Sequence, residues 1–129
     1  VAEALNAEGI GTLLFDLLTE AESRDRRNVF DIPLLAQRLV LATRHVTEMR
    51  DLRSLPVGFF GASTGAAAAL EAAAELGAAI YAIVSRGGRP DLALPALPRV
   101  TAPTLLLVAS PLPWPTSPMW ALCAHGGES

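Results

Sequence analysis

The stretch that decides the fold is PVGFFGASTGAAAAL, residues 56–70. An apolar run of strand length, 56–60, leads into Gly-Ala-Ser-Thr-Gly at 61–65, and alanines that favour a helix follow at once. A buried strand that turns directly into a helix is typical of α/β folds. The stretch therefore predicts a strand, a sharp turn, and a helix over 64–76 that Gly77 ends.

The segments on either side repeat this alternation of strand and helix. Downstream, AIYAIVS at 79–85 and PTLLLVA at 103–109 are short apolar runs of the kind that parallel sheets bury. Upstream, IGTLLF at 10–15 is a similar run, and it follows the end of a helix that Gly9 closes. We expect an α/β fold with a mainly parallel sheet, right-handed crossovers and helices on both faces.

A further helix is predicted between the first apolar run and the second. Asp31 is a suitable N-cap, and Pro33 is tolerated in the first turn. The helix should reach about Arg50, since apolar residues recur on one face at Leu35, Leu39, Ala42, Val46 and Met49. Residues 19–29 are charged and have no apolar period, so they are expected to form a solvated loop.

Composition limits the classes of function. The 129 residues are 51% hydrophobic and have a net charge of −3, which predicts a folded core and no basic surface for nucleic acid. No apolar run has the roughly 18 to 20 residues of a membrane span. A single cysteine, Cys123, excludes an internal disulfide, and no secretory signal is visible. We expect a cytoplasmic protein with neither membrane nor nucleic-acid partners.

The chain divides into two parts at about residue 110. Residues 1–109 carry the α/β pattern, whereas 110–129 are rich in proline and follow neither helical nor strand periodicity. A covering helix normally follows such a strand, so we interpret 110–129 as a divergent, poorly ordered tail with an altered reading frame. A natural flexible extension is the alternative. Since Val1 already lies inside a helical pattern, we expect that an upstream portion is missing.

The turn at 61–65 has the pattern Gly-x-Ser-x-Gly of a nucleophile elbow. A strained strand-to-helix turn lifts the serine hydroxyl clear of the backbone, and the glycines relieve crowding between strand and helix. Ser63 is then the candidate nucleophile, and the backbone amide of Thr64 is a donor to an oxyanion. An ordinary tight turn, with Gly61 and Gly65 in no catalytic role, is the alternative.

From 1 to about 109 the chain resembles an α/β-hydrolase of the dienelactone hydrolase-like group. The resemblance lies in GIGTLLFDLLT at 9–19, LPVGFFGASTGAAAALEAAA at 55–74, AIVSRGGRPDLA at 82–93 and RVTAPTLLLV at 99–108. It implies a partial α/β-hydrolase fold and a serine hydrolase that cleaves small esters or lactones through an acyl-Ser63 intermediate. Similar domains also occur joined to phosphoribosyltransferase-type domains, so a fused neighbour is expected to be missing.

The acid, the base and the substrate-binding residues of a hydrolase site each have a candidate in the sequence. Asp91 follows the apolar run at 79–85 and is a candidate acid, and the alternative is that Asp91 caps a turn or short helix. His125 stands in the order expected of a base, but it falls in the divergent tail, where a solvated residue is the alternative. Arg86 and Arg89 could bind a substrate carboxylate, or simply belong to a solvated loop.

No cofactor is expected. The chain has no phosphate-binding or dinucleotide-binding glycine pattern and no cluster with metal-ligand spacing. Because the acid, the base and one oxyanion donor are not evident, a non-catalytic fragment of a hydrolase fold remains an alternative, with self-association through open sheet edges. A binding module for small anions, using Arg86 and Arg89, is a third interpretation.

Overall fold

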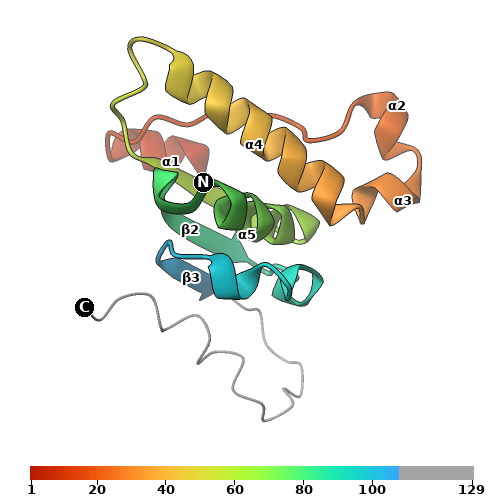
Figure 1. The fold of residues 1–129 in the computed structure, drawn as a ribbon. Coiled ribbons are helices and arrows are strands. Elements are labelled where there is room, and N and C mark those ends of the chain that lie inside the picture. The colour runs from red at the N-terminus through yellow and green to blue at the C-terminus, as the bar shows by residue number, and fades with distance from the viewer. Residues whose placement is uncertain (108–129) are drawn as a thin grey trace.

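The computed structural model describes residues 1–107 of the chain, so the predictions made for 110–129, His125 included, lie outside the described residues (Figure 1). A parallel three-stranded sheet with strand order β1-β2-β3 forms the centre. Its strands are β1 (Val57–Ala62), β2 (Ile80–Arg86) and β3 (Thr104–Leu107). The α/β class is confirmed, as are the three strands predicted downstream of residue 55.

Helix α5 (Thr64–Leu76) runs from the end of β1 back across the sheet, and it has the bounds predicted. Six of its seven alanines are almost completely buried, all but Ala74, because small side chains let the helix axis approach the strands closely. Phe59 of β1 and Ile83 of β2 pack against it and form the centre of the core. Gly77 ends the helix with a φ of +57°, a conformation that glycine adopts without steric cost.

Helix α4 (Ile32–Glu48) packs against α5 rather than directly on the sheet (Figure 1). Asp31 caps it as predicted, with its carboxylate accepting a hydrogen bond from the Leu34 amide at 3.0 Å. The buried face is rotated from the predicted one: Met49 is exposed, and the core-facing residues are Ile32, Leu35, Ala36, Val40 and Thr43. The apolar pattern did not include Thr43 because threonine is a polar residue. Thr43 can nevertheless be buried, because its hydroxyl donates a hydrogen bond to the Leu39 carbonyl of the same helix at 2.8 Å.

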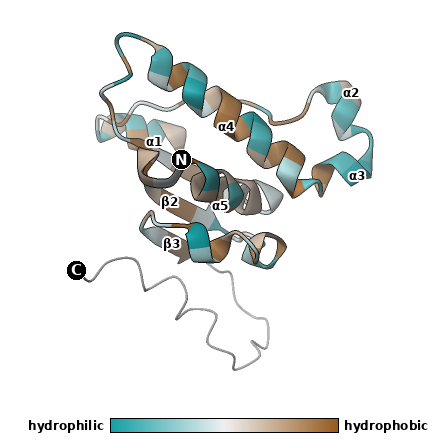
Figure 2. Ribbon diagram, in the orientation of Figure 1, coloured by the Kyte–Doolittle hydropathy of each residue, from teal (hydrophilic) through white to brown (hydrophobic). Residues whose placement is uncertain are grey.

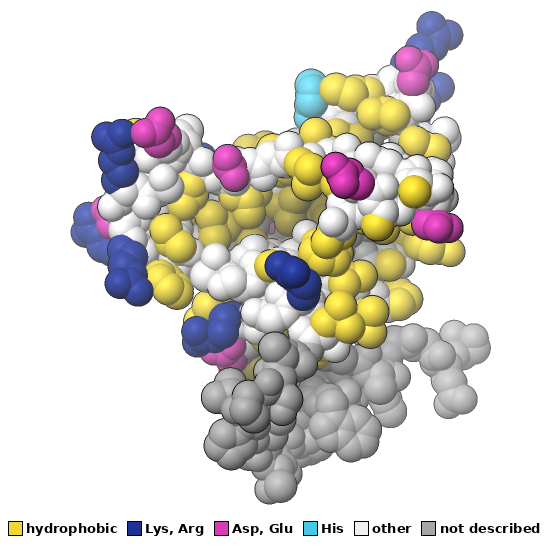
Figure 3. Space-filling model, turned by 180° about the vertical axis from the view of Figure 1, so that it is seen from behind, with side chains coloured by type: hydrophobic (Ala, Val, Ile, Leu, Met, Phe, Trp, Pro, Cys, Tyr) yellow, Lys and Arg dark blue, Asp and Glu magenta, His cyan; other side chains and the backbone are white. Residues whose placement is uncertain are grey.

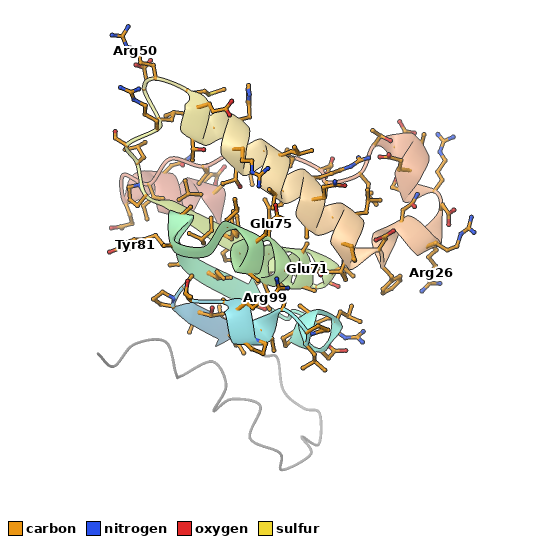
Figure 4. All side chains as sticks on the ribbon, in the orientation of Figure 1. Arg26, Arg50, Glu71, Glu75, Tyr81 and Arg99 are labelled. Atoms are coloured by element: carbon orange, nitrogen blue, oxygen red, sulfur yellow. The ribbon has the colours of Figure 1, made fainter. Side chains whose placement is uncertain are left out.

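The two helices are also joined at their surface. The Arg44 guanidinium of α4 lies 3.0 Å from the Glu75 carboxylate of α5, and Figure 4 labels Glu75 on the side of α5 towards α4. Figure 2 shows hydrophobic residues on α4 gathered along the side that faces α5. Burial of this apolar stripe, more than the exposed ion pair, holds α4 in place.

The prediction of a strand at 10–15 is wrong, because the structure has no strand at these residues. Helix α1 (Ala2–Ala7) and its closure by Gly9, with a φ of +78°, are as expected. The following residues form no strand, and Ile10, Leu13, Leu14 and Phe15 are exposed. A strand exists only when a neighbour completes its hydrogen bonds, and none of the described strands pairs with this segment.

The solvated loop predicted at 19–29 is also wrong, because two short helices occupy it. These are α2 (Glu20–Ser23) and α3 (Arg26–Val29). The Thr19 hydroxyl and the Glu22 carboxylate form a capping box at the start of α2. Arg38 of α4 binds the same carboxylate and also donates to the Leu17 carbonyl at 3.2 Å, so it fastens the segment to α4. Three one-turn 3₁₀ helices complete the described elements: η1 (Gly77–Ala79), η2 (Pro90–Ala93) and η3 (Leu97–Arg99).

Hydrogen bonds from Arg38, and then from Thr19, lower the pKa of Glu22 to about 2. Since this lies below the ordinary value of 4.5, ionised Glu22 stabilises the fold above pH 4.5, and its contribution is lost as the pH falls towards about 2. We therefore expect Glu22→Gln to lower the urea midpoint at about pH 7. The urea midpoints of the variant and the wild type should become equal by about pH 2 to 3.

The matched control is Glu8→Gln, which removes an exposed carboxylate that has no ion-pair partner among the described residues. It should change the urea midpoint little at any pH. A Glu22→Gln difference that stayed constant from about pH 7 to 3 would contradict the assignment, because loss of simple packing does not titrate.

The two faces of the sheet differ. Within residues 1–107, α5 covers one face, while Phe60, Leu105 and Leu107 on the other are exposed. Phe60 pairs in register with Val84, which pairs with Leu105, so these side chains form an apolar row across the sheet. A helical layer on this second face stays a prediction. No described helix has both the length and the apolar content needed to cross a membrane.

Candidate functional site

The candidate site is the junction between β1 and α5. Ser63 stands there with φ 51° and ψ −126°, and it is the only non-glycine residue with positive φ in residues 1–107. Its side chain is exposed and makes no capping hydrogen bond to α5. A strained serine whose hydroxyl is left free is the geometry of a nucleophile elbow.

Two backbone amides hold Ser63 in this conformation. The Ser63 carbonyl accepts hydrogen bonds from the amide of Ala66 at 3.1 Å and from the amide of Arg89 at 3.3 Å. One amide belongs to the first turn of α5 and the other to the loop that follows β2. The carbonyl is thus directed into the protein, and the side chain is left on the outside.

Gly61 allows the strand and helix to meet closely, as predicted. A Cβ at this position would lie 2.6 Å from the Gly65 carbonyl oxygen and 2.7 Å from the Ala66 Cα. The prediction for Gly65 is not supported in the same way, since a Cβ there would meet nothing within 4 Å. Gly65 faces open space because the helix has already turned away from the strand.

Gly88 packs beneath the elbow from the loop after β2. A Cβ at Gly88 would overlap the Ser85 hydroxyl and lie 2.5 Å from the Ala66 Cβ. Ser85 is 2% exposed and pairs in register with Gly61, so the close contact adjoins the elbow itself. The next residue, Arg89, donates to the Ser63 carbonyl. Gly88 therefore fixes the distance between this loop and α5.

We expect Gly88→Ala to destabilise the protein by about 1 to 3 kcal/mol and to lower the reactivity of Ser63, because the added methyl pushes the loop from α5. Urea unfolding and labelling with a fluorophosphonate measure the two effects. Gly11→Ala is the control, since a Cβ there meets nothing within 4 Å. Equal stability of the two variants, within about 0.5 kcal/mol, would contradict this role for Gly88.

The backbone amide of Thr64 lies next to Ser63, at the N-terminus of α5. Thr64 is the first residue of α5, and the first amides of a helix have no intrahelical acceptor. The 13-residue helix adds its dipole, whose positive end lies at this terminus. Negative charge that develops on a carbonyl oxygen beside Ser63 would be stabilised here.

A cleft of about 540 Å³ opens beside the elbow. Thr64 and Gly65 form part of its wall, and the segment 15–18 lies opposite. The apolar lining residues are Phe15, Leu17, Leu18, Val29 and Leu35, and the remaining ones are Asp16, Glu20 and Ser23. Figure 3, seen from behind, shows a hollow lined with hydrophobic side chains and charged side chains around it. The volume suits a small organic molecule.

The other predicted site residues are placed as follows. Asp91 lies in η2, in the loop whose backbone holds Ser63, and the Arg89 guanidinium binds both its carboxylate oxygens at 2.7 to 3.2 Å. This pairing holds the pKa of Asp91 below its ordinary value and raises that of Arg89. Arg86 is exposed at the end of β2, opposite Ala62.

Neither Arg86 nor Arg89 lines the cleft, and the one histidine described, His45, is exposed on α4. The structure thus brings Ser63, the Thr64 amide and the loop at 86–91 together. The part of the cleft wall at 20–29 was not predicted from the sequence, which indicated a solvated loop there. The Thr19-x-x-Glu22 capping box was the signal that could have revealed helix α2 there.

No protein-family model matches the chain. Two proteins from Mycobacterium tuberculosis strains CDC 1551 / Oshkosh and ATCC 25618 / H37Rv, each described as a "putative phosphoribosyl transferase", are 60% identical over 108 residues. The match covers 84% of this chain but only 24% of each relative. The crystal structure of a dienelactone hydrolase from Anabaena variabilis superimposes with a TM-score of 0.77 at 57% identity, over 83% of this chain and 51% of that one.

Proposed function

We propose that residues 1–107 form the nucleophile-bearing core of a serine hydrolase that cleaves small esters or lactones through an acyl-Ser63 intermediate. The observation that carries this proposal is the strained, exposed conformation of Ser63 at a strand-to-helix junction. The adjoining cleft and the similarity to a dienelactone hydrolase support it.

In the proposed reaction, the Ser63 oxygen attacks the ester carbonyl and its proton passes to a base. The carbonyl oxygen becomes an oxyanion, which accepts a hydrogen bond from the Thr64 amide. The C–O bond to the alcohol then breaks, and the alcohol leaves with the proton. Water attacks the acyl-enzyme in the same way, which releases the acid and restores Ser63. For a lactone, acid and alcohol remain one molecule.

The acid and the base of the proposed reaction are assigned to residues other than Ser63 and Thr64. Asp91 is proposed as the acid, because its loop is bonded to the Ser63 backbone; it would orient a histidine with an oxygen released from Arg89. The base is proposed to lie outside the 129-residue chain, since His45 is exposed on α4 and His125 stands in the divergent tail. The chain alone is therefore expected to be inactive or nearly so.

The activity named for the Mycobacterium relatives is proposed to reside in a part of those proteins that this chain does not match. The chain spans about a quarter of their length, and the matched part carries the Ser63 elbow. A hydrolase-type domain joined to a transferase-type domain reconciles that name with the dienelactone hydrolase similarity.

The test is hydrolysis of p-nitrophenyl butyrate by the 129-residue chain and by the longer protein that is expected from the sequence, which is called the full-length protein below. We expect turnover by the full-length protein that Ser63→Ala removes, and little or none by the chain alone. A folded full-length protein without esterase activity and without fluorophosphonate labelling would overturn the proposal. It would leave the alternative, a non-catalytic domain with a hydrolase fold.

A further inference from the structure

The cleft beside Ser63 has an uneven distribution of charge. Its floor is apolar, while Asp16 and Glu20 contribute two carboxylates. Among the described residues that line it, none is an arginine, and the chain has no lysine. The lining therefore carries negative charge and no positive charge.

The nearby arginines do not neutralise this charge fully. Asp16 has no ion-pair partner in the described part of the chain. Glu20 lies 2.8 Å from Arg24, but both side chains are strongly exposed, so the pair is weak and mobile in water. Arg38 is committed to Glu22 and the Leu17 carbonyl, and Arg89 to Asp91.

The position of the oxyanion donor decides which part of a substrate enters the cleft. Thr64 and Gly65 both line it, so an ester carbonyl bound to the Thr64 amide would stand at its wall. The acyl chain attached to that carbonyl would then extend along Phe15, Leu17 and Leu35. Burial of its methylene groups would contribute to binding.

From this arrangement we propose that the cleft selects esters with an apolar acyl chain, neutral or cationic, and disfavours acyl chains that end in a carboxylate. This inference rests on the proposed function, because it assigns the substrate class of the same site. It differs from the expectation that Arg86 and Arg89 bind an anionic substrate, since neither lines the cleft.

The size of the effect follows from like-charge repulsion at the edge of an open cleft. If the carboxylate of a substrate lies within about 8 Å of Asp16 and Glu20, in surroundings of intermediate dielectric, the two repulsions together should lower kcat/KM for that substrate roughly tenfold, with Asp16 contributing about threefold. Salt screens charges over a Debye length of about 10 Å at 0.1 M, so the loss should shrink as the ionic strength rises.

The experiment uses the full-length protein and three p-nitrophenyl esters of similar length. These are the butyrate, the monoester of succinate, and the ester of 4-(trimethylammonio)butyrate, whose acyl chains are neutral, anionic and cationic. At low salt we expect kcat/KM for the succinate ester to be about tenfold below that for the butyrate, and the cationic ester to match or exceed the butyrate.

Two variants in the cleft and one control variant test whether the cleft carboxylates cause the slower hydrolysis of the anionic ester. Asp16→Asn and Glu20→Gln should each bring the anionic ester closer to the neutral one, by about threefold for Asp16→Asn. Asp51→Asn makes the same charge change beyond the end of α4, near Arg50, which Figure 4 shows at the end of that helix remote from α2 and α3. Asp51→Asn should leave the ratio unchanged.

The outcomes separate this inference from the proposed function. Hydrolysis of the butyrate with equal or faster hydrolysis of the succinate ester would overturn the inference and leave the hydrolase assignment intact. So would an equal shift in Asp51→Asn and Asp16→Asn, which would reflect only net charge. Absence of hydrolysis of all three esters, together with absence of fluorophosphonate labelling, would overturn both.

Discussion

Ser63→Ala is expected to lower the kcat of the full-length protein for p-nitrophenyl butyrate by at least about 10⁴-fold, because the proposed acyl intermediate forms on the Ser63 oxygen. KM should change little, since the cleft and the Thr64 amide stay in place. Steady-state kinetics on the purified variant provides the measurement. A variant that keeps more than about a tenth of the activity would contradict the role of Ser63.

Two further variants separate the loss of a nucleophile from the loss of the fold. Ser63→Gly also removes the hydroxyl, but it relieves the positive φ of 51° and should be as stable as wild type or about 1 kcal/mol more stable. Thr64→Ala keeps the backbone amide, which is the group assigned to the oxyanion, and should lose less than about tenfold in kcat.

Gly61→Ala is expected to destabilise the protein by about 2 to 4 kcal/mol, with loss of the elbow. Its Cβ would lie 2.6 to 2.8 Å from three backbone atoms of Gly65 and Ala66. Backbone cannot move aside as a flexible side chain can, so β1 and α5 would have to separate. The urea midpoint and the rate of fluorophosphonate labelling should both fall.

Gly65→Ala is the matched control for this prediction. It makes the same chemical change four residues later, where a Cβ meets nothing within 4 Å. Alanine also favours a helix more than glycine does, so Gly65→Ala should be neutral or slightly stabilising. Equal destabilisation by the two substitutions would show that the glycines matter for some reason other than the close approach at Gly61.

The elbow was predictable because its signals are local. The apolar run, the glycines and the alanine run stand next to one another in the chain, so β1, Ser63 and α5 lie at their predicted positions. The same holds for Asp31, whose cap on α4 depends only on the next three residues. The role of Gly88 was not predictable, because it depends on how closely the loop after β2 approaches α5.

The errors concern features that neighbours in space determine. The segment 10–15 has the composition of a strand, yet strand formation needs a paired neighbour. Residues 19–29 have no apolar period, and their two short helices depend on a capping box and on Arg38 of α4. Residues 15–29 contribute most of the cleft lining, so the sequence indicated the candidate nucleophile but not the shape of the surface beside it.

The most direct test of the nucleophilic Ser63 is to locate a fluorophosphonate adduct on the folded, full-length protein by peptide mass spectrometry. We expect one adduct, on the peptide that contains Ser63, and none after prior denaturation, because the reactivity comes from the strained turn. A folded protein that is not modified at Ser63, or that is modified equally well when unfolded, would contradict this expectation.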